Sequence, residues 1–120
     1  MTLASAIHLV LHTLVPGAVA WFFFRAQWRK AWVIMLATML VDLDHLLADP
    51  IYDPNRCGIG FHPLHTAPAI AVYAVLAILP ATRLVGVGLV LHIALDLADC
   101  GVQRALRFSL SFPFPLTAAI

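Results

Sequence analysis

Four long apolar stretches, separated by short polar or charged segments, make up most of the chain. The first runs from Thr2 to Phe24 and is interrupted only by two histidines and by small or hydroxyl-bearing residues. About 20 apolar residues are enough for a helix to cross the roughly 30 Å of hydrocarbon in a bilayer. The pattern predicts helices over about 3–24, 31–48, 63–82 and 84–103, followed by an interfacial or extended tail over 104–120.

The composition places the chain among integral membrane proteins. Hydrophobic residues make up 62% and charged residues 11% of its 120 residues, whereas soluble domains average about 45–50% and 25%. The mean hydropathy is +0.95. We therefore expect residues 1–120 to form a single all-α domain, an integral membrane bundle of four transmembrane helices. A net charge of +1 without a basic stripe argues against a nucleic-acid partner.

The acidic residues and histidines are of a kind that membrane helices seldom carry. All six acids are Asp, and there are also six His. The densest group, Asp42-Leu43-Asp44-His45, lies at the end of the second apolar stretch. A charged side chain at the centre of a membrane helix costs about 2.5–3.5 kcal/mol on insertion scales. Because a metal ion commonly compensates an Asp/His cluster, this group predicts a metal site.

The predicted connectivity brings the other histidines and aspartates to the same place. Helices joined by short turns run alternately up and down, so the starts of the first and third and the ends of the second and fourth share one side. His8 and His12, like His92 and Asp96, are four residues apart and share a helix face. We expect nine side chains to ligate metal at this end of the bundle: His8, His12, Asp42, Asp44, His45, His62, His65, His92 and Asp96.

Several residues on this side have more than one role open to them. On a regular helix Asp44 points away from the other ligands of its stretch, so it ligates a second ion, orients a neighbouring His, or turns inward through a distorted last turn. Three roles are open to Asp99: metal ligand, acid that orients a ligand, and interfacial acid. Three states are open to Cys57 and Cys100: soft metal ligands, unlinked thiols and, in an oxidising compartment, a disulfide.

The donors exceed the four ligands of one zinc site, which favours two or three divalent ions, zinc in particular, with a bridging Asp. A bound ion lowers the pKa of water toward about 7 and so supplies hydroxide for hydrolysis. Asp44 and His65 are the candidate acid–base groups. Arg56 is the candidate for binding an anionic group of the substrate. Because the site opens near the membrane surface, we expect a lipid or lipid-linked ester or phosphoester as substrate.

Two other functions fit the same residues. A metal transporter or metal-binding sensor would use the same donors, but no polar path leads from them to the basic side of the predicted bundle. A haem-binding electron carrier would ligate iron through His pairs, and the accompanying Asp residues disfavour it. The sequence leaves the oligomeric state open, a homodimer included.

The basic residues favour one orientation in the membrane. Four lie on the side away from the site, namely Arg25, Arg29, Lys30 and Arg83, and three lie on the site side, namely Arg56, Arg104 and Arg107. Because cytoplasmic loops carry the excess of Lys and Arg, this distribution predicts an outward-facing site.

The order of the motifs resembles that of small bacterial inner-membrane proteins described as metal-dependent hydrolases. The similarity lies in residues 41–48, in the loop 50–57, in Phe61-His62-Pro63-Leu64-His65 and in the segment from His92 to Cys100. It is strongest to an uncharacterised family of about this length. The resemblance implies a multi-pass protein of the bacterial inner membrane with hydrolase activity. A distant similarity of that family to zinc-dependent phospholipase C and P1-type nucleases implies phosphoester hydrolysis.

Overall fold

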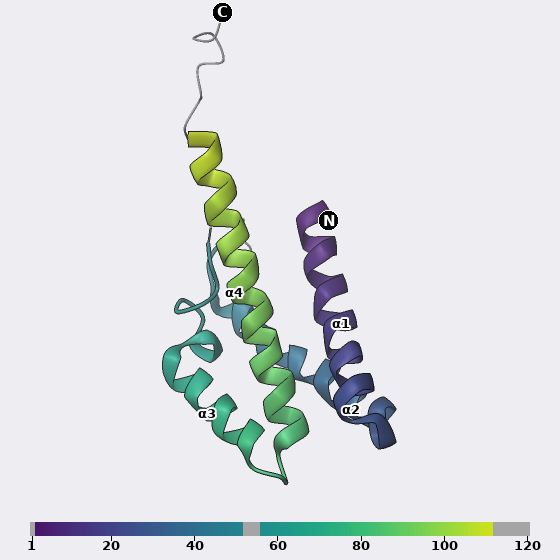
Figure 1. The fold of residues 1–120 in the computed structure, drawn as a ribbon. Coiled ribbons are helices and arrows are strands. Elements are labelled where there is room, and N and C mark those ends of the chain that lie inside the picture. Colours follow the sequence, from purple (N-terminus) through teal and green to yellow (C-terminus); the bar gives the residue numbers. More distant parts are fainter. Residues whose placement is uncertain (1, 52–55, 112–120) are drawn as a thin grey trace, which may run out of the picture.

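The structure is a computed structural model that describes residues 2–51 and 56–111, and the regular elements of these residues are all helical. They are α1 (Leu3–Phe23), η1 (Arg25–Gln27), α2 (Trp28–Ala37), η2 (Thr38–Leu47), η3 (Pro63–His65), α3 (Ala67–Ile78) and α4 (Arg83–Ser111), where η denotes a 3₁₀ helix. α1 and α4 run antiparallel, α3 packs against α4, and α2 lies behind (Figure 1). The predicted all-α class is confirmed.

Two helices of the described chain are long and apolar enough to cross a membrane, Leu3–Phe23 and the segment Arg83–Phe108 of α4. α3 is apolar but has 12 residues, and α2 has 10. Large apolar side chains also face outward, with Phe22 73% and Phe23 78% exposed. Exposed apolar side chains of this kind are more favourable in contact with an apolar environment than in contact with water.

The second predicted helix, 31–48, is divided into two elements. α2 ends at Ala37, and η2 continues as a 3₁₀ helix to Leu47. The hydroxyl of Thr38 donates to the carbonyl of Met35 at this junction. A period of three residues places Thr38, Val41 and Asp44 on one buried face, whereas the 3.6-residue period of an α-helix would spread them around the axis. The 3₁₀ geometry therefore turns Asp44 inward.

The third and fourth predicted helices also have different boundaries. The third begins as the turn η3, and α3 ends at Ile78 because Pro80 favours the extended conformation in which Leu79 is found. α4 continues to Ser111, so residues 104–111 of the predicted tail are helical rather than extended. The rest of that tail, 112–120, lies outside the described residues.

Two glycines allow α4 to pack closely against its neighbours. A Cβ built on Gly86 would lie 2.0 Å from the backbone nitrogen of Ala77 in α3, and one on Gly88 would lie 3.0 Å from Cα of Met35 in α2. The buried apolar residues form two clusters, Ala20 with Ala31 and Met35, and Val41 with Tyr73 and Ile93. Because Val41 and Ile93 directly adjoin Asp42 and His92 in the sequence, the second cluster positions the backbone that carries these polar side chains.

Candidate metal centre

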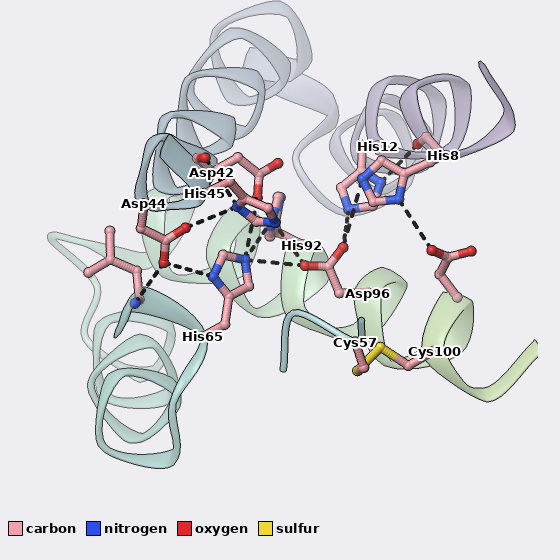
Figure 2. Close-up of polar contacts among 12 residues, drawn as sticks. His8, His12, Asp42, Asp44, His45, Cys57, His65, His92, Asp96 and Cys100 are labelled. Atoms are coloured by element: carbon pink, nitrogen blue, oxygen red, sulfur yellow. Dashed lines mark hydrogen bonds and ion pairs between the residues drawn. A yellow bond between two sulfur atoms is a disulfide. The ribbon is translucent and has the colours of Figure 1, made fainter. Parts of the chain in front are cut away.

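The structure brings all nine predicted ligands into one polar cluster, built from α1, η2, η3, α4 and the loop before η3. Figure 2 labels all of these ligands except His62. Their donor atoms form three groups, each with all atoms within 4.8 Å of one another: Asp42–His65–His92–Asp96, His8–His12–Asp96 and Asp44–His45–His62. Each group could hold a metal ion. Asp96 belongs to two of the groups, so two sites would share one carboxylate.

The first group, called the central group below, has the spacing of a tetrahedral ligand set. Nε2 of His65 lies 3.3 Å from Asp42 Oδ1, 3.3 Å from Asp96 Oδ2 and 3.4 Å from His92 Nε2. Nε2 of His92 lies 3.1 Å from Asp42 Oδ1 and 3.3 Å from Asp96 Oδ2. Ligands about 2.0–2.1 Å from zinc at the corners of a tetrahedron are about 3.3–3.4 Å apart. These distances therefore leave room for an ion the size of zinc between the four donors.

Asp44 orients the rings of the neighbouring histidines. Its Oδ2 accepts hydrogen bonds from His65 Nδ1 at 3.1 Å and from the Leu64 backbone N–H at 2.8 Å, and its Oδ1 accepts from His45 Nδ1 at 3.0 Å. A proton on Nδ1 of His65 leaves the lone pair of Nε2 facing the central group, as in carboxylate–histidine–metal triads. Of the three roles open to Asp44, these contacts favour the orienting one.

His12 presents an unpaired nitrogen to Asp96 from the side of α1. Its Nδ1 donates to the carbonyl of His8 at 2.9 Å, so in the neutral ring its Nε2 carries the lone pair. Within the described residues this buried Nε2 has no hydrogen-bond partner, and it lies 3.2 Å from Asp96 Oδ1. Two electron-rich atoms at this distance repel each other unless a proton or a metal cation lies between them. Nδ1 of His92 is a second buried ring nitrogen to which the described structure offers no partner.

His8 lies at the outer edge of the cluster. Its Nε2 is 3.9 Å from Asp96 Oδ1, and its Nδ1 is 3.8 Å from Asp99 Oδ2. Asp99 also accepts a hydrogen bond from Gln103 Nε2 at 3.1 Å. Asp99 is outside the three donor groups, and its position next to His8 favours the role of an orienting acid over that of a ligand.

Three carboxylates surround the ring of His65. Asp44 Oδ2 lies 3.1 Å from its Nδ1, and Asp42 Oδ1 and Asp96 Oδ2 each lie 3.3 Å from its Nε2. A metal ion and a proton compete for Nε2, so metal binding at the central group is coupled to proton release.

A cavity of about 370 Å³ opens beside the cluster. Its wall includes the metal-binding candidates His8, Asp42, His45, His62 and Asp96 and the apolar residues Ala4, Leu9 and Ile51. Arg56 also lines the cavity. Its guanidinium donates to the carbonyl of Pro50 at 2.8 Å and lies 4.5 Å from the centre of the Phe61 ring. The cavity thus combines an apolar wall with a fixed positive charge and exposed donor atoms.

A disulfide joins Cys57 to Cys100, which selects one of the three states that the sequence leaves open for these cysteines (Figure 2). It ties the loop that carries His62 to α4. Gly58, the next residue in this loop, packs against the site, because a Cβ there would lie 3.1 Å from His62 and 3.6 Å from His45. Sequence reasoning missed Gly58, since a single loop glycine carries no signal that would distinguish it.

A family model matches residues 2–103, a range that contains all nine predicted ligands. The chain belongs to DUF6122, a family of unknown function. Membership in DUF6122 agrees with the resemblance to an uncharacterised family of about this length. No curated protein and no solved structure matches this DUF6122 chain, so neither comparison links it to phospholipase C or P1 nuclease.

Proposed function

We propose that the protein is a membrane-embedded hydrolase that uses divalent metal ions, zinc in particular. The observation that carries the proposal is the central group, in which two imidazoles and two carboxylates approach within 3.1–3.4 Å in an otherwise apolar chain. Such a cluster is costly in apolar surroundings unless a cation compensates it. When bound, a divalent ion lowers the pKa of water toward about 7 and polarises a carbonyl or phosphoryl oxygen.

The contacts suggest a division of roles among the polar residues. Asp44 and His65 lie deep in the cluster, 5% and 0% exposed, where they serve as orienting acid and ligand rather than as acid–base groups. The cavity wall instead contains His45 and His62. Burial lowers the pKa of His62, so its ring is neutral at pH 7 and suited to accept a proton. We assign proton transfer to His62.

We also propose that the chain crosses the bacterial inner membrane four times. α1 and α4 are each long enough alone. α2 contributes 10 residues and η2 another 10, and at about 1.5 and 2.0 Å per residue they extend about 35 Å together. α3 is the short fourth span, which requires the η3 turn to reach into the membrane beside the site.

The cavity supports a lipid or lipid-linked ester or phosphoester as substrate. Ala4, Leu9 and Ile51 offer an apolar wall for the hydrocarbon part, whereas Arg56 and the metal-binding residues face the polar part. The guanidinium of Arg56 is fixed by its carbonyl and ring contacts, which suits it to hold an anionic group in one position.

The test is to purify the protein in detergent without exposure to chelators and to measure its metal content and its esterase and phosphodiesterase activities. We expect at least one zinc-like ion per chain and an activity that a chelator removes and added zinc restores. Less than one ion per chain would contradict the proposal. Leu9→Ala is a suitable control for the metal content, because this residue lines the cavity but offers no donor atom.

A metal-binding or metal-transport protein without hydrolase activity is the second candidate. It is favoured by the four protein donors of the central group, which would fill a tetrahedral shell as in structural zinc sites. Stoichiometric metal without any hydrolytic activity would support it, and uptake of zinc into liposomes that contain the protein would distinguish transport from storage.

The disulfide supports an outward-facing site. Disulfides persist in oxidising compartments such as the bacterial periplasm, and Cys57–Cys100 lies on the site side. α4 runs from the basic turn at Arg83 toward the site side, so the C-terminus should lie outside. We expect a periplasm-specific phosphatase fused after residue 120 to be active and a cytoplasm-specific fluorescent reporter fused there to be dark. The opposite pattern would reverse the orientation.

A further inference from the structure

We infer that a second divalent cation binds between His8, His12 and Asp96 and that its free coordination positions face the cavity. This inference rests on the proposed metal centre and adds to it a site with a different role. The first supporting observation is the use of both oxygens of Asp96. Its Oδ2 lies 3.3 Å from His65 and 3.3 Å from His92, whereas its Oδ1 lies 3.2 Å from His12. This arrangement would allow one carboxylate to bridge two ions.

The second observation is the orientation of the His12 ring. This side chain is 2% exposed, and its Nδ1–H···O bond to the His8 carbonyl selects the Nδ1–H tautomer of the neutral ring. Its Nε2 lone pair is therefore buried and directed at Asp96 Oδ1 without a hydrogen-bond partner among the described residues. A buried acceptor that faces another acceptor lacks compensation, which a proton or a metal cation between them would supply. The donor atoms of His8, His12 and Asp96, all within 4.8 Å of one another, favour the metal. The distance of 3.2 Å is close to the edge of a tetrahedron around zinc.

The third observation is the exposure of this site. The group has three protein donors, and two of its residues, His8 and Asp96, line the cavity. Nε2 of His8 is still 3.9 Å from Asp96 Oδ1, so its half-buried ring must move slightly inward to complete the set. Catalytic zinc sites typically have three protein ligands and a free position, whereas structural sites have four. The free position would accept water or an anionic oxygen of the phosphate or carboxylate class.

The third donor group is a weaker candidate for a cation. Both oxygens of its Asp44 already accept hydrogen bonds, from His45, from His65 and from the Leu64 backbone. An ion there would have to displace these donors, whereas the lone pair of His12 is free. The geometry thus supports two ions rather than three, bridged by Asp96.

The test compares His8→Ala with Leu9→Ala, its neighbour on the cavity wall, after equilibration of each purified protein with Zn²⁺ or Co²⁺. We expect two ions per chain in the wild type and in Leu9→Ala, and one in His8→Ala. The Co²⁺ spectrum of the ion that remains should match that of the tighter-binding ion in the wild type. Magnetic coupling between the two Co²⁺ ions in the wild type would show that they share a bridging ligand.

Two results would overturn the inference while the proposed function stands. One is a wild type that binds a single ion and loses it on His65→Ala but not on His8→Ala. The other is retention of both ions in His8→Ala and also in His12→Asn, a variant that shortens the donor within the same site. A wild type that binds no ion would instead remove the proposed function itself. Circular dichroism shows whether each variant is folded.

Discussion

Replacing Asp96 with alanine is expected to remove metal from both sites and to lower chelator-sensitive hydrolysis by roughly a thousandfold or more. Both of its carboxylate oxygens face imidazole nitrogens, His65 and His92 on one side and His12 on the other. Loss of this side chain leaves three imidazoles without their shared anion. No other acid of the described chain lies at an equivalent distance from His12 and His65 together.

Asp99→Ala is the matched control for this prediction. Asp99 also lies on α4, one helical turn further along, and its carboxylate contacts His8 and Gln103 rather than the central group. We expect Asp99→Ala to retain the ion of the central group and to weaken binding at the outer site at most tenfold to a hundredfold, as is typical for loss of an orienting partner. Metal content and rate would be measured on both variants. Equal metal content in Asp96→Ala and the wild type would contradict the prediction.

The convergence of the polar residues could be predicted because it depends on connectivity. Short turns force alternate helix ends to one side, and in apolar stretches His and Asp are conspicuous. The four-residue spacing of His92 and Asp96 also predicts that they share a face, and in the structure they project from one face of α4 with Nε2 and Oδ2 3.3 Å apart. Local spacing in the sequence is therefore sufficient to predict which side chains share a face when the residues lie on a regular α-helix.

The orientation of Asp44 could not be predicted from its spacing. An α-helical period turns it away from its neighbours, and the 3₁₀ geometry of η2 turns it inward. Its partners Leu64 and His65 are 20 and 21 residues away in the sequence. The conformation of η2 therefore depends on tertiary contacts that a local pattern does not contain.

The sequence predicts a bridging Asp and allows a disulfide, but it does not identify which Asp is shared or which state the two cysteines adopt. Cys57 and Cys100 are separated by 43 residues, and three states of the two thiols agree with their positions. Spacing places Asp96 on a helix face but does not assign its Oδ1 and Oδ2 to different neighbours. Such assignments depend on side-chain rotamers, which the packing of α1 and η3 against α4 selects.

Gly86→Ala is expected to destabilise the protein by about 1–3 kcal/mol or more, the range for inserting atoms into a well-packed interior. A Cβ at this position would lie 2.0 Å from the backbone nitrogen of Ala77 and 2.3 Å from the backbone carbonyl carbon of Leu76. Backbone atoms cannot rotate away as a flexible side chain can, so α3 and α4 must separate. Because η3 directly precedes α3, this separation would also draw His65 away from His92 and weaken metal binding.

Gly101→Ala provides the contrast on the same helix. A Cβ at Gly101 would meet no atom of the described chain within 4 Å, and alanine in a helix interior is more favourable than glycine by about 0.5–1 kcal/mol. Thermal unfolding in detergent should therefore show a lower Tm for Gly86→Ala and an equal or higher Tm for Gly101→Ala. If both variants unfold at or above the wild-type temperature, the close contact of α3 and α4 is not what fixes the spacing of His65 and His92. A lowered Tm with unchanged metal affinity would show instead that the donor groups keep their geometry independently of this helix pair.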